Sequence, residues 1–280
     1  MYTKPYFKIY MDWKGSDTNM KYRHEWKHEI HYGDMLILRQ RLAAIAKRDS
    51  YAISPICHAP ICRTPGQTKE TSDAQLKKSP PAYQKGTSPV PCTAYEVRSL
   101  YFDNISDKAL REKIDGVKAR EKFRIRCYNR DYAFIRLEKK SKLNGLCLKE
   151  NAIITAKQVD SLLHGDYGWM AGSGVPLAAE LYAKMMGQGL RPKTIVDYTR
   201  EPFVFSPGNV RITLDYNIRT GMHSTDFLNP NCVTVPAGDS NIILEVKWDD
   251  FLPDIIRDAV QLKGCRVGAF SKYAACRAYG

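Results

Sequence analysis

The sequence predicts an α+β protein in which antiparallel strands dominate and short helices flank them. Seven segments have the β-rich composition of strands, with apolar and charged residues alternating at every second position. The helical segments between them are short and end at recognisable stop signals. Arginine and lysine, with an occasional glutamate, recur on one side of most of these strands.

The elements are expected in a definite chain order. Strands are expected at HEWKHEI, AYEVRSLYFD, EKFRIRCY, AFIRLEKKSK, IVDYTREPFVF, VRITLDYNIRT and NIILEVKW. A first helix is expected over residues 33–48, where apolar residues form one stripe and Asp34 can cap the start. Further helical signals lie in DKALREKIDG, AKQVDSLLHG, PLAAELYAKMMGQG, FLPDIIRDAVQL and FSKYAACRAY.

Composition narrows the class of partner. Lys and Arg number 43 against 30 Asp and Glu, a formal charge of +13. A surplus of this size indicates a polyanionic partner such as nucleic acid, an anionic membrane or a phosphate chain. No apolar run reaches the roughly 18 residues that a membrane span needs, and the start lacks a signal-peptide core. We therefore expect a soluble, cytoplasmic protein with no transmembrane segment, and a membrane partner is unsupported.

One stretch differs from its surroundings. Residues 49–93 are rich in Pro, Ser, Thr, Lys and Gln and show neither helical nor strand periodicity, which predicts a disordered insertion. The 48 residues before it hold one strand and one helix, too little for an independent core. We therefore expect a single domain over residues 1–280. The eight cysteines have no paired spacing, which favours free thiols over disulfides or a zinc site.

The charged faces of the strands allow two interpretations. Residues that share a face include Glu25 with Lys27 and Glu29, Glu96 with Arg98, Arg124 with Arg126, Arg136 with Glu138 and Lys140, Arg211 with Asp215, and Glu245 with Lys247. An antiparallel sheet commonly exposes one charged face to water. The alternative is a barrel whose apolar side is covered by helices and whose polar lumen holds an anion. Cations gathered in such a lumen would need several phosphates or carboxylates to neutralise them.

The order of the motifs favours the second interpretation. The series HEWKHEI, YEVRSLYFDN, KFRIRCY, LEKKSKLNGLCLKE, DYTRE, VRITLD, ILEVKW and AFSKYAACR closely resembles the polyphosphate polymerase domain of the vacuolar transporter chaperone family, from about residue 22 to 279. That domain belongs to the triphosphate tunnel metalloenzymes. The resemblance implies an eight-stranded antiparallel tunnel barrel with flanking helices, through which phosphate chains pass.

The resemblance also implies site residues. Cations that match the family's catalytic tunnel residues are Lys27, Arg124, Arg126, Lys140, Lys149, Arg200, Arg211 and Lys272. All of these except Lys149 and Lys272 are also expected to bind substrate, together with Arg98. Glu245 in LEVK matches the carboxylate that binds a divalent metal. From the faces that they share with these cations, Glu25, Glu29 and Glu138 are expected to complete the metal shell, to orient a water or to hold neighbouring arginines. Asp197 and Asp215 are expected to be structural partners of arginine.

The implied function is a metal-dependent polyphosphate polymerase. The γ-phosphate of ATP would be transferred to a growing polyphosphate chain, with Mn²⁺ or Mg²⁺ as cofactor and no protein nucleophile. The first alternative is a triphosphate hydrolase of the same fold, which would use the same cations. The second is a non-catalytic polyphosphate-binding module. A nucleic-acid binder is less favoured, because the aromatic residues are expected on the apolar faces, away from the cations.

Overall fold

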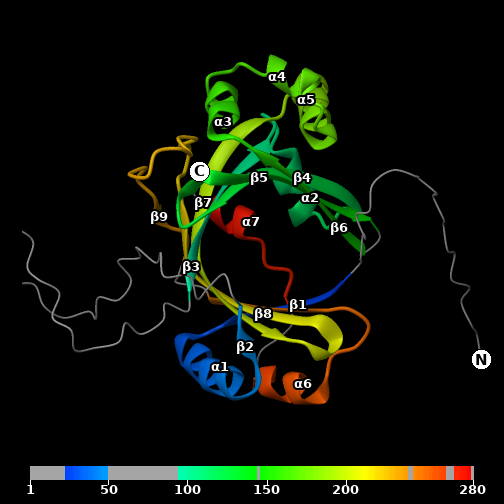
Figure 1. The fold of residues 1–280 in the computed structure, drawn as a ribbon, viewed down its shortest axis with the longest axis vertical. Helices are drawn as coiled ribbons and strands as arrows, with labels where there is room; N and C mark the ends of the chain where they lie inside the picture. The colour runs from blue at the N-terminus through cyan, green and yellow to red at the C-terminus, as the bar shows by residue number, and fades with distance from the viewer. Residues whose placement is uncertain (1–22, 50–93, 144–145, 239–241, 263–267, 279–280) are drawn as a thin grey trace, which may run out of the picture.

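The protein forms one curled antiparallel sheet with helices packed on both ends of its outer surface (Figure 1). The computed structural model describes residues 23–49, 94–143, 146–238, 242–262 and 268–278. Apart from Asp49, the expected insertion at 49–93 lies outside the described residues.

Eight strands follow one another across the sheet in the order β1-β10-β8-β7-β3-β4-β5-β6. Their bounds are β1 His24–Ile30, β3 Tyr95–Asp103, β4 Ala119–Tyr128, β5 Asp131–Leu143, β6 Leu146–Ile154, β7 Arg191–Phe205, β8 Val210–Thr220 and β10 Ile242–Trp248. Two short strands complete the sheet, β2 Lys47–Arg48 beside β7 and β9 Val235–Pro236 beside β8. All seven expected strands are present, and β6 is an eighth that strand composition alone did not indicate.

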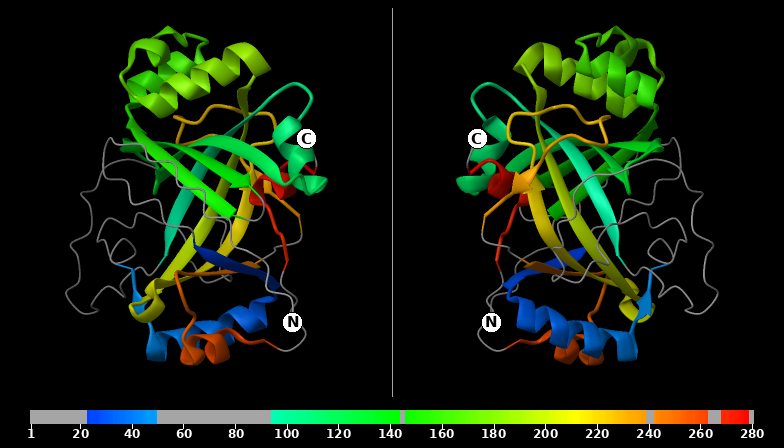
Figure 2. Two further views of the ribbon diagram at one scale, coloured as in Figure 1. Left: turned by 90° about the vertical axis from the view of Figure 1, so that its right-hand side faces the viewer. Right: turned by 90° about the vertical axis from the view of Figure 1, so that its left-hand side faces the viewer.

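Five of the helices cover the convex side in two groups (Figures 1 and 2). Helices α3 Ala156–Leu163, α4 Gly168–Gly172 and α5 Pro176–Gln188 pack against β3, β4 and β5 through one apolar cluster that includes Leu100, Phe123 and Leu181. Helices α1 Tyr32–Ile45 and α6 Asp254–Val260 cover β8 and β10 through a second cluster. Trp26 and Trp248 belong to this second core and pack edge to face at 4.7 Å between ring centroids.

The ends of the helices differ in detail from the expectation. Helix α1 begins after His31, whose backbone N–H donates to Asp34 at 3.3 Å, so Asp34 completes a capping box from inside the helix. The last helical signal yields only α7 Lys272–Cys276, and α2 Lys108–Ile114 follows β3.

Short helix α7 lies within the curve of the sheet (Figure 1). Its Tyr273 and Cys276 share a third, concave-side cluster with Tyr101, Val196 and Tyr198.

The sheet curls until side chains from its two ends meet. The backbones of β1 and β6 are not paired. Lys140 on β5 nevertheless lies 3.4 Å from Glu25 on β1, measured between Nζ and Oε2. The expected eight-stranded antiparallel barrel with flanking helices is therefore confirmed, and at this seam a side-chain contact stands in place of backbone pairing.

Candidate active site

Strand register decides which side chains face the lumen. Residues opposite each other in paired strands lie on the same face of a sheet. Lys27 pairs with Glu245, which pairs with Thr213, and across the barrel Arg124 pairs with Glu138. This concave face, which we call the lumen face, receives cations from every one of the eight long strands except β3.

The first charge cluster surrounds Glu138. One carboxylate oxygen lies 2.7 Å from Arg124 and 3.7 Å from Arg126, and the other lies 2.7 Å from Lys149. Burial alone would raise the pKa of Glu138, but these three cations outweigh it and hold the pKa far below its usual range. Burial lowers the pKa of Lys149 to about 8, although Glu138 opposes the shift. Glu138 thus orders three of the cations expected in the site.

The second cluster surrounds Asp215, which is fully buried on β8. Arg200 donates hydrogen bonds to both of its carboxylate oxygens, at 2.6 and 2.7 Å, and Lys272 from α7 lies 2.6 Å away. Ser271 caps α7 by accepting a hydrogen bond from the backbone N–H of Ala274, which sets the start of the helix at Lys272. Asp215 is therefore a structural partner of the site cations, as expected.

The third cluster joins the two ends of the sheet. Glu25 lies 2.5 Å from Lys27 and 3.4 Å from Lys140, and Glu245 lies 2.7 Å from Lys247. Glu245 is almost completely buried. Its burial raises its pKa, but the surrounding lysines and Arg200 hold the pKa well below the usual value. Glu245 is therefore an ionised carboxylate inside the lumen.

Two cavities occupy the lumen and share several lining residues, including Glu25, Lys140 and Cys147. A cavity of about 250 Å³ is lined by Lys149, Arg200, Arg211, Thr213, Glu245 and Lys247. Arg211 also contacts Asp49 at 3.0 Å and donates to the Tyr95 hydroxyl at 3.2 Å. A larger cavity of about 500 Å³ extends past Lys27 to Lys113, Arg120, Lys122 and Lys142. Lysine and arginine greatly outnumber acidic residues along both.

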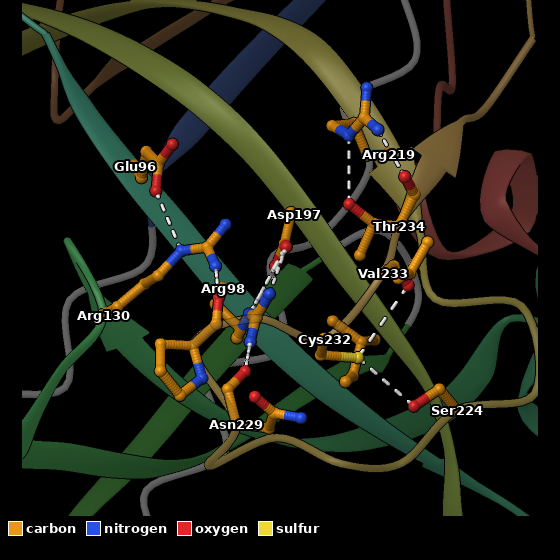
Figure 3. Close-up of polar contacts among 12 residues, drawn as sticks. Glu96, Arg98, Arg130, Asp197, Arg219, Ser224, Asn229, Cys232, Val233 and Thr234 are labelled. Carbon is orange, nitrogen blue, oxygen red and sulfur yellow. Dashed lines mark hydrogen bonds and ion pairs between the residues drawn. The ribbon is translucent and has the colours of Figure 1, made fainter. Parts of the chain in front are cut away.

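Arg98 does not join this site. Tyr95, Val97, Ser99 and Tyr101 take the lumen positions of β3, so the intervening Arg98 points to the convex face. There its guanidinium donates hydrogen bonds to both carboxylate oxygens of Asp197, at 2.9 and 3.0 Å, and to the carbonyl of Asn229 at 2.7 Å (Figure 3). The structure therefore separates Arg98 from the cations with which it was expected to bind phosphate. The expected pairing of Asp197 with an arginine is present.

Sequence reasoning missed Lys122 and three tyrosines. Lys122 stands two residues before Arg124, so the same alternation that assigned Arg124 also places Lys122 on the lumen face. The hydroxyl groups of Tyr101, Tyr198 and Tyr95 accept hydrogen bonds from Arg124, Arg126 and Arg211 respectively. The aromatic residues are thus not confined to the apolar faces. These rings are at most 5% exposed, so they offer no surface on which bases could stack.

The comparison with protein families decides the assignment. The model of the VTC domain family matches residues 22–279. The chain belongs to the VTC domain family. It is accordingly an enzyme of the triphosphate tunnel fold that acts on phosphate compounds, and the cation-lined lumen suits such ligands. No curated protein matches the sequence.

Solved structures similar to this VTC domain are distant in sequence. A putative adenylyl cyclase from Hippeastrum, described as having a dominant triphosphatase activity, is 11% identical with a TM-score of 0.49, and the match covers 91% of this chain and 94% of that chain. A protein from Pyrococcus horikoshii OT3 is also 11% identical, with a TM-score of 0.41 and coverage of 86% and 92%. Within the part of the VTC domain that the structure describes, no helix has the length and apolar character of a membrane span.

The tunnel fold of a VTC domain implies dependence on a divalent metal. No group of three or more His, Cys, Asp or Glu side chains is gathered for a metal among the described residues. Glu245 nevertheless offers a buried carboxylate, and its cross-strand neighbour Thr213 carries a buried hydroxyl oxygen with no hydrogen-bond partner among the described residues. Oxygen donors of this kind suit a hard cation that takes its other ligands from phosphate and water. The residues present therefore fit a metal held jointly with the substrate.

Proposed function

We propose that this VTC domain is a polyphosphate polymerase that transfers the γ-phosphate of ATP to the end of a polyphosphate chain. The observation that carries the proposal is the concentration of cations around two adjoining cavities, contributed by β1, β4, β5, β6, β7, β8 and β10. A linear phosphate chain needs many cations spaced along its path, and arginine can hold two phosphate oxygens at once.

Each cluster has a role in this reaction. Arg124, Arg126 and Lys149 are held in place by Glu138, so they present fixed positive charge without reorganising during the transfer. Arg200 and Lys272 are fixed in the same way by Asp215. Phosphoryl transfer needs little covalent help from the protein, because positioning and charge neutralisation supply most of the catalysis. The terminal oxygen of the chain acts as the nucleophile.

A divalent cation, Mn²⁺ or Mg²⁺, would be held by Glu245 with Thr213 beside it. When bound, it would neutralise charge on the triphosphate and polarise the transferred group. Lys247, which contacts Glu245 at 2.7 Å, keeps that carboxylate ionised and available as a ligand.

The carboxylates of the lumen are poor candidates for the general base of a hydrolase. Hydrolysis benefits from a general base whose pKa lies near the working pH. The pKa values of Glu25, Glu138, Asp215 and Glu245 are all lowered by surrounding cations, so these groups are weak bases. A phosphate oxygen is already ionised and needs no base.

We also infer one domain over residues 1–280. Strand β1 and helix α1 precede the segment at 50–93, yet β1 pairs with β10 and β2 pairs with β7. Both sides of that segment therefore contribute to the same sheet.

The test is to incubate purified protein with ATP and either Mn²⁺ or Mg²⁺, and to analyse the products on a gel stained for polyphosphate beside an assay for free phosphate. We expect a ladder of chains together with ADP. Free phosphate without chains would replace the proposal with triphosphate hydrolysis. Tight binding of polyphosphate without any turnover would indicate a binding module, and a preference for nucleic acid over polyphosphate would exclude the proposal.

A further inference from the structure

Tyr101 is a buried phenol surrounded by cations. Its side chain is 3% exposed, and its hydroxyl accepts a hydrogen bond from Nη1 of Arg124 at 2.8 Å. Lys122 Nζ and Arg124 Cζ each lie 5.6 Å from the centre of its ring. The proposed reaction assigns no role to this residue.

The position of the ring is also held by helix α7. Tyr101 stacks on Tyr273 of α7 with 4.9 Å between centroids and 26° between planes. The Tyr273 hydroxyl donates to Asp103 at 2.7 Å. Asp103 in turn accepts hydrogen bonds from the backbone N–H groups of Ala109 and Leu110 at the start of α2. Helices α2 and α7 together therefore keep Tyr101 against Arg124.

The charged groups that face Tyr101 come mainly from β4, which supplies Lys122, Arg124 and Arg126. The nearest carboxylate on β5, Glu138, is engaged by Arg124. On β7 the cross-strand neighbour is the uncharged Thr194. The surroundings of the phenol are therefore strongly positive on the side of β4, and the acid on its own strand, Asp103, is engaged by Tyr273 and by the start of α2.

These surroundings favour the ionised phenol. Burial by itself raises the pKa of Tyr101, but Arg124, Lys122 and Arg126 outweigh it and lower the pKa to about 7. Burial lowers the pKa of Lys122 to about 8, and Tyr101 opposes that shift. Tyr95 provides a contrast within the same lumen, because burial raises its pKa even though it accepts a hydrogen bond from Arg211. Arg200 and Arg211 both lower the pKa of Tyr95, yet they do not outweigh its burial, so two nearby arginines are not enough to ionise this buried tyrosine.

We propose that Tyr101 is a positioning residue. Its phenolate neutralises part of the positive charge of Arg124 and Lys122 when no polyanion is bound, and it takes up a proton when a polyanion binds. The proposal rests on the function proposed above, since it assumes that phosphate groups approach Arg124. The proton comes from solvent to the phenolate oxygen, and no bond in the substrate is made or broken. The bound polyanion then replaces the phenolate as the counterion of these cations.

The consequence is a link between protonation and affinity. Negative charge beside Tyr101 favours its neutral form and moves its pKa back toward the ordinary value of about 10. Between about pH 7 and 10, polyanion binding is therefore accompanied by proton uptake at this residue. In that range, this group makes the affinity for the polyanion rise as the pH falls.

The first test is spectroscopic and needs no catalysis. The absorbance of ionised tyrosine is followed from pH 5.5 to 9 in the wild-type protein, Tyr101→Phe and the matched control Tyr95→Phe. We expect a step of one tyrosine near pH 7 in the wild type and in Tyr95→Phe, and no such step in Tyr101→Phe. Absence of the step from the wild type, or its persistence in Tyr101→Phe, overturns the proposal.

The second test measures protons directly. Tripolyphosphate is titrated into each protein at pH 8 with EDTA, by calorimetry in buffers of different ionisation enthalpy. We expect the wild type to take up about one proton more than Tyr101→Phe. If the wild type and Tyr101→Phe bind tripolyphosphate with equal proton uptake, the role of Tyr101 is overturned and the proposed function is not. If the wild type does not bind tripolyphosphate, the proposed function is overturned.

A third variant keeps the test decisive if Tyr101→Phe fails to fold. Lys122→Met removes one of the three cations, so the tyrosine step should move to higher pH. A step that stays in place would show that the titrating tyrosine is not Tyr101.

Discussion

The Oε2 atom of Glu138 lies 2.7 Å from Nε of Arg124, in a lumen where that carboxylate is 1% exposed. Lys149 contacts the other oxygen at 2.7 Å. Glu138 therefore holds Arg124 and Lys149 in place before any substrate arrives. The cost of this arrangement is the desolvation of the buried charges.

Glu138→Gln is expected to destabilise the protein and to make its stability depend on polyanion. The amide keeps the shape but leaves Arg124 and Lys149 without their counterion, and breaking a buried pair in this way costs about 3–5 kcal/mol. Tripolyphosphate should restore part of the loss by replacing the missing charge. Urea unfolding with and without tripolyphosphate measures both effects. The matched control Glu180→Gln removes a more exposed partner of Lys139 and should cost less than about 1 kcal/mol; an equal cost for both variants contradicts the prediction.

The contribution of Glu138 should disappear in acid. Its pKa is lowered in the folded protein, whereas the unfolded chain binds a proton at the ordinary pKa of about 4.3. Unfolding therefore takes up a proton at low pH, so the stabilisation is complete above that value and declines as the pH falls below it. The difference in unfolding free energy between the wild type and Glu138→Gln should shrink between pH 6 and pH 3. A difference that stays constant over this range would mean that Glu138 is not held ionised.

Arg124→Ala and Glu245→Ala should each reduce turnover by about 100-fold or more while leaving the circular dichroism unchanged. Each change removes a charge that is aimed at the transferred phosphate or its metal. Arg111→Ala, on the exposed side of α2, is the matched control and should retain activity. Full activity in either lumen variant, with an intact fold, would exclude the proposed site.

Thr213→Val should weaken the binding of the metal without abolishing catalysis. Thr213 is the cross-strand partner of Glu245, and its buried hydroxyl has no partner among the described residues. The nearly isosteric change should raise the Mn²⁺ or Mg²⁺ concentration needed for half-maximal activity by about 10-fold, with activity recovered at saturating metal. Thr199→Val on the opposite face is the control. Identical metal titrations for the wild type and Thr213→Val would remove Thr213 from the site.

Arg98→Met should affect stability and not substrate affinity. Arg98 lies on the convex face, and its loss leaves Asp197 as an unpaired buried charge at a cost of about 3–5 kcal/mol. The double variant Arg98→Met with Asp197→Leu should recover much of this loss. KM for ATP should stay at the wild-type value in the double variant. A large rise in KM would return Arg98 to the phosphate-binding set.

Much of the architecture was predictable from local pattern. Alternation of polar and apolar residues located seven of the eight long strands, because successive side chains in a strand point to opposite faces. Strand β6 escaped that analysis, since LCLKENAII combines a short alternation with a glutamate and an asparagine. The matching motifs nevertheless placed Lys149 on it among the expected site residues.

The sequence by itself determined that the strands carry one charged and one apolar face, and which cations follow one another along each strand. Only the tertiary structure decided which face of β3 turns inward, and it turned Arg98 outward and Tyr101 inward. Likewise, only the fold brought Lys272 of α7 against Asp215 and Glu25 against Lys140. The physical reason is that alternation is a local property of one strand, whereas the direction of curling depends on pairing between distant strands and on the helices that cover the convex side.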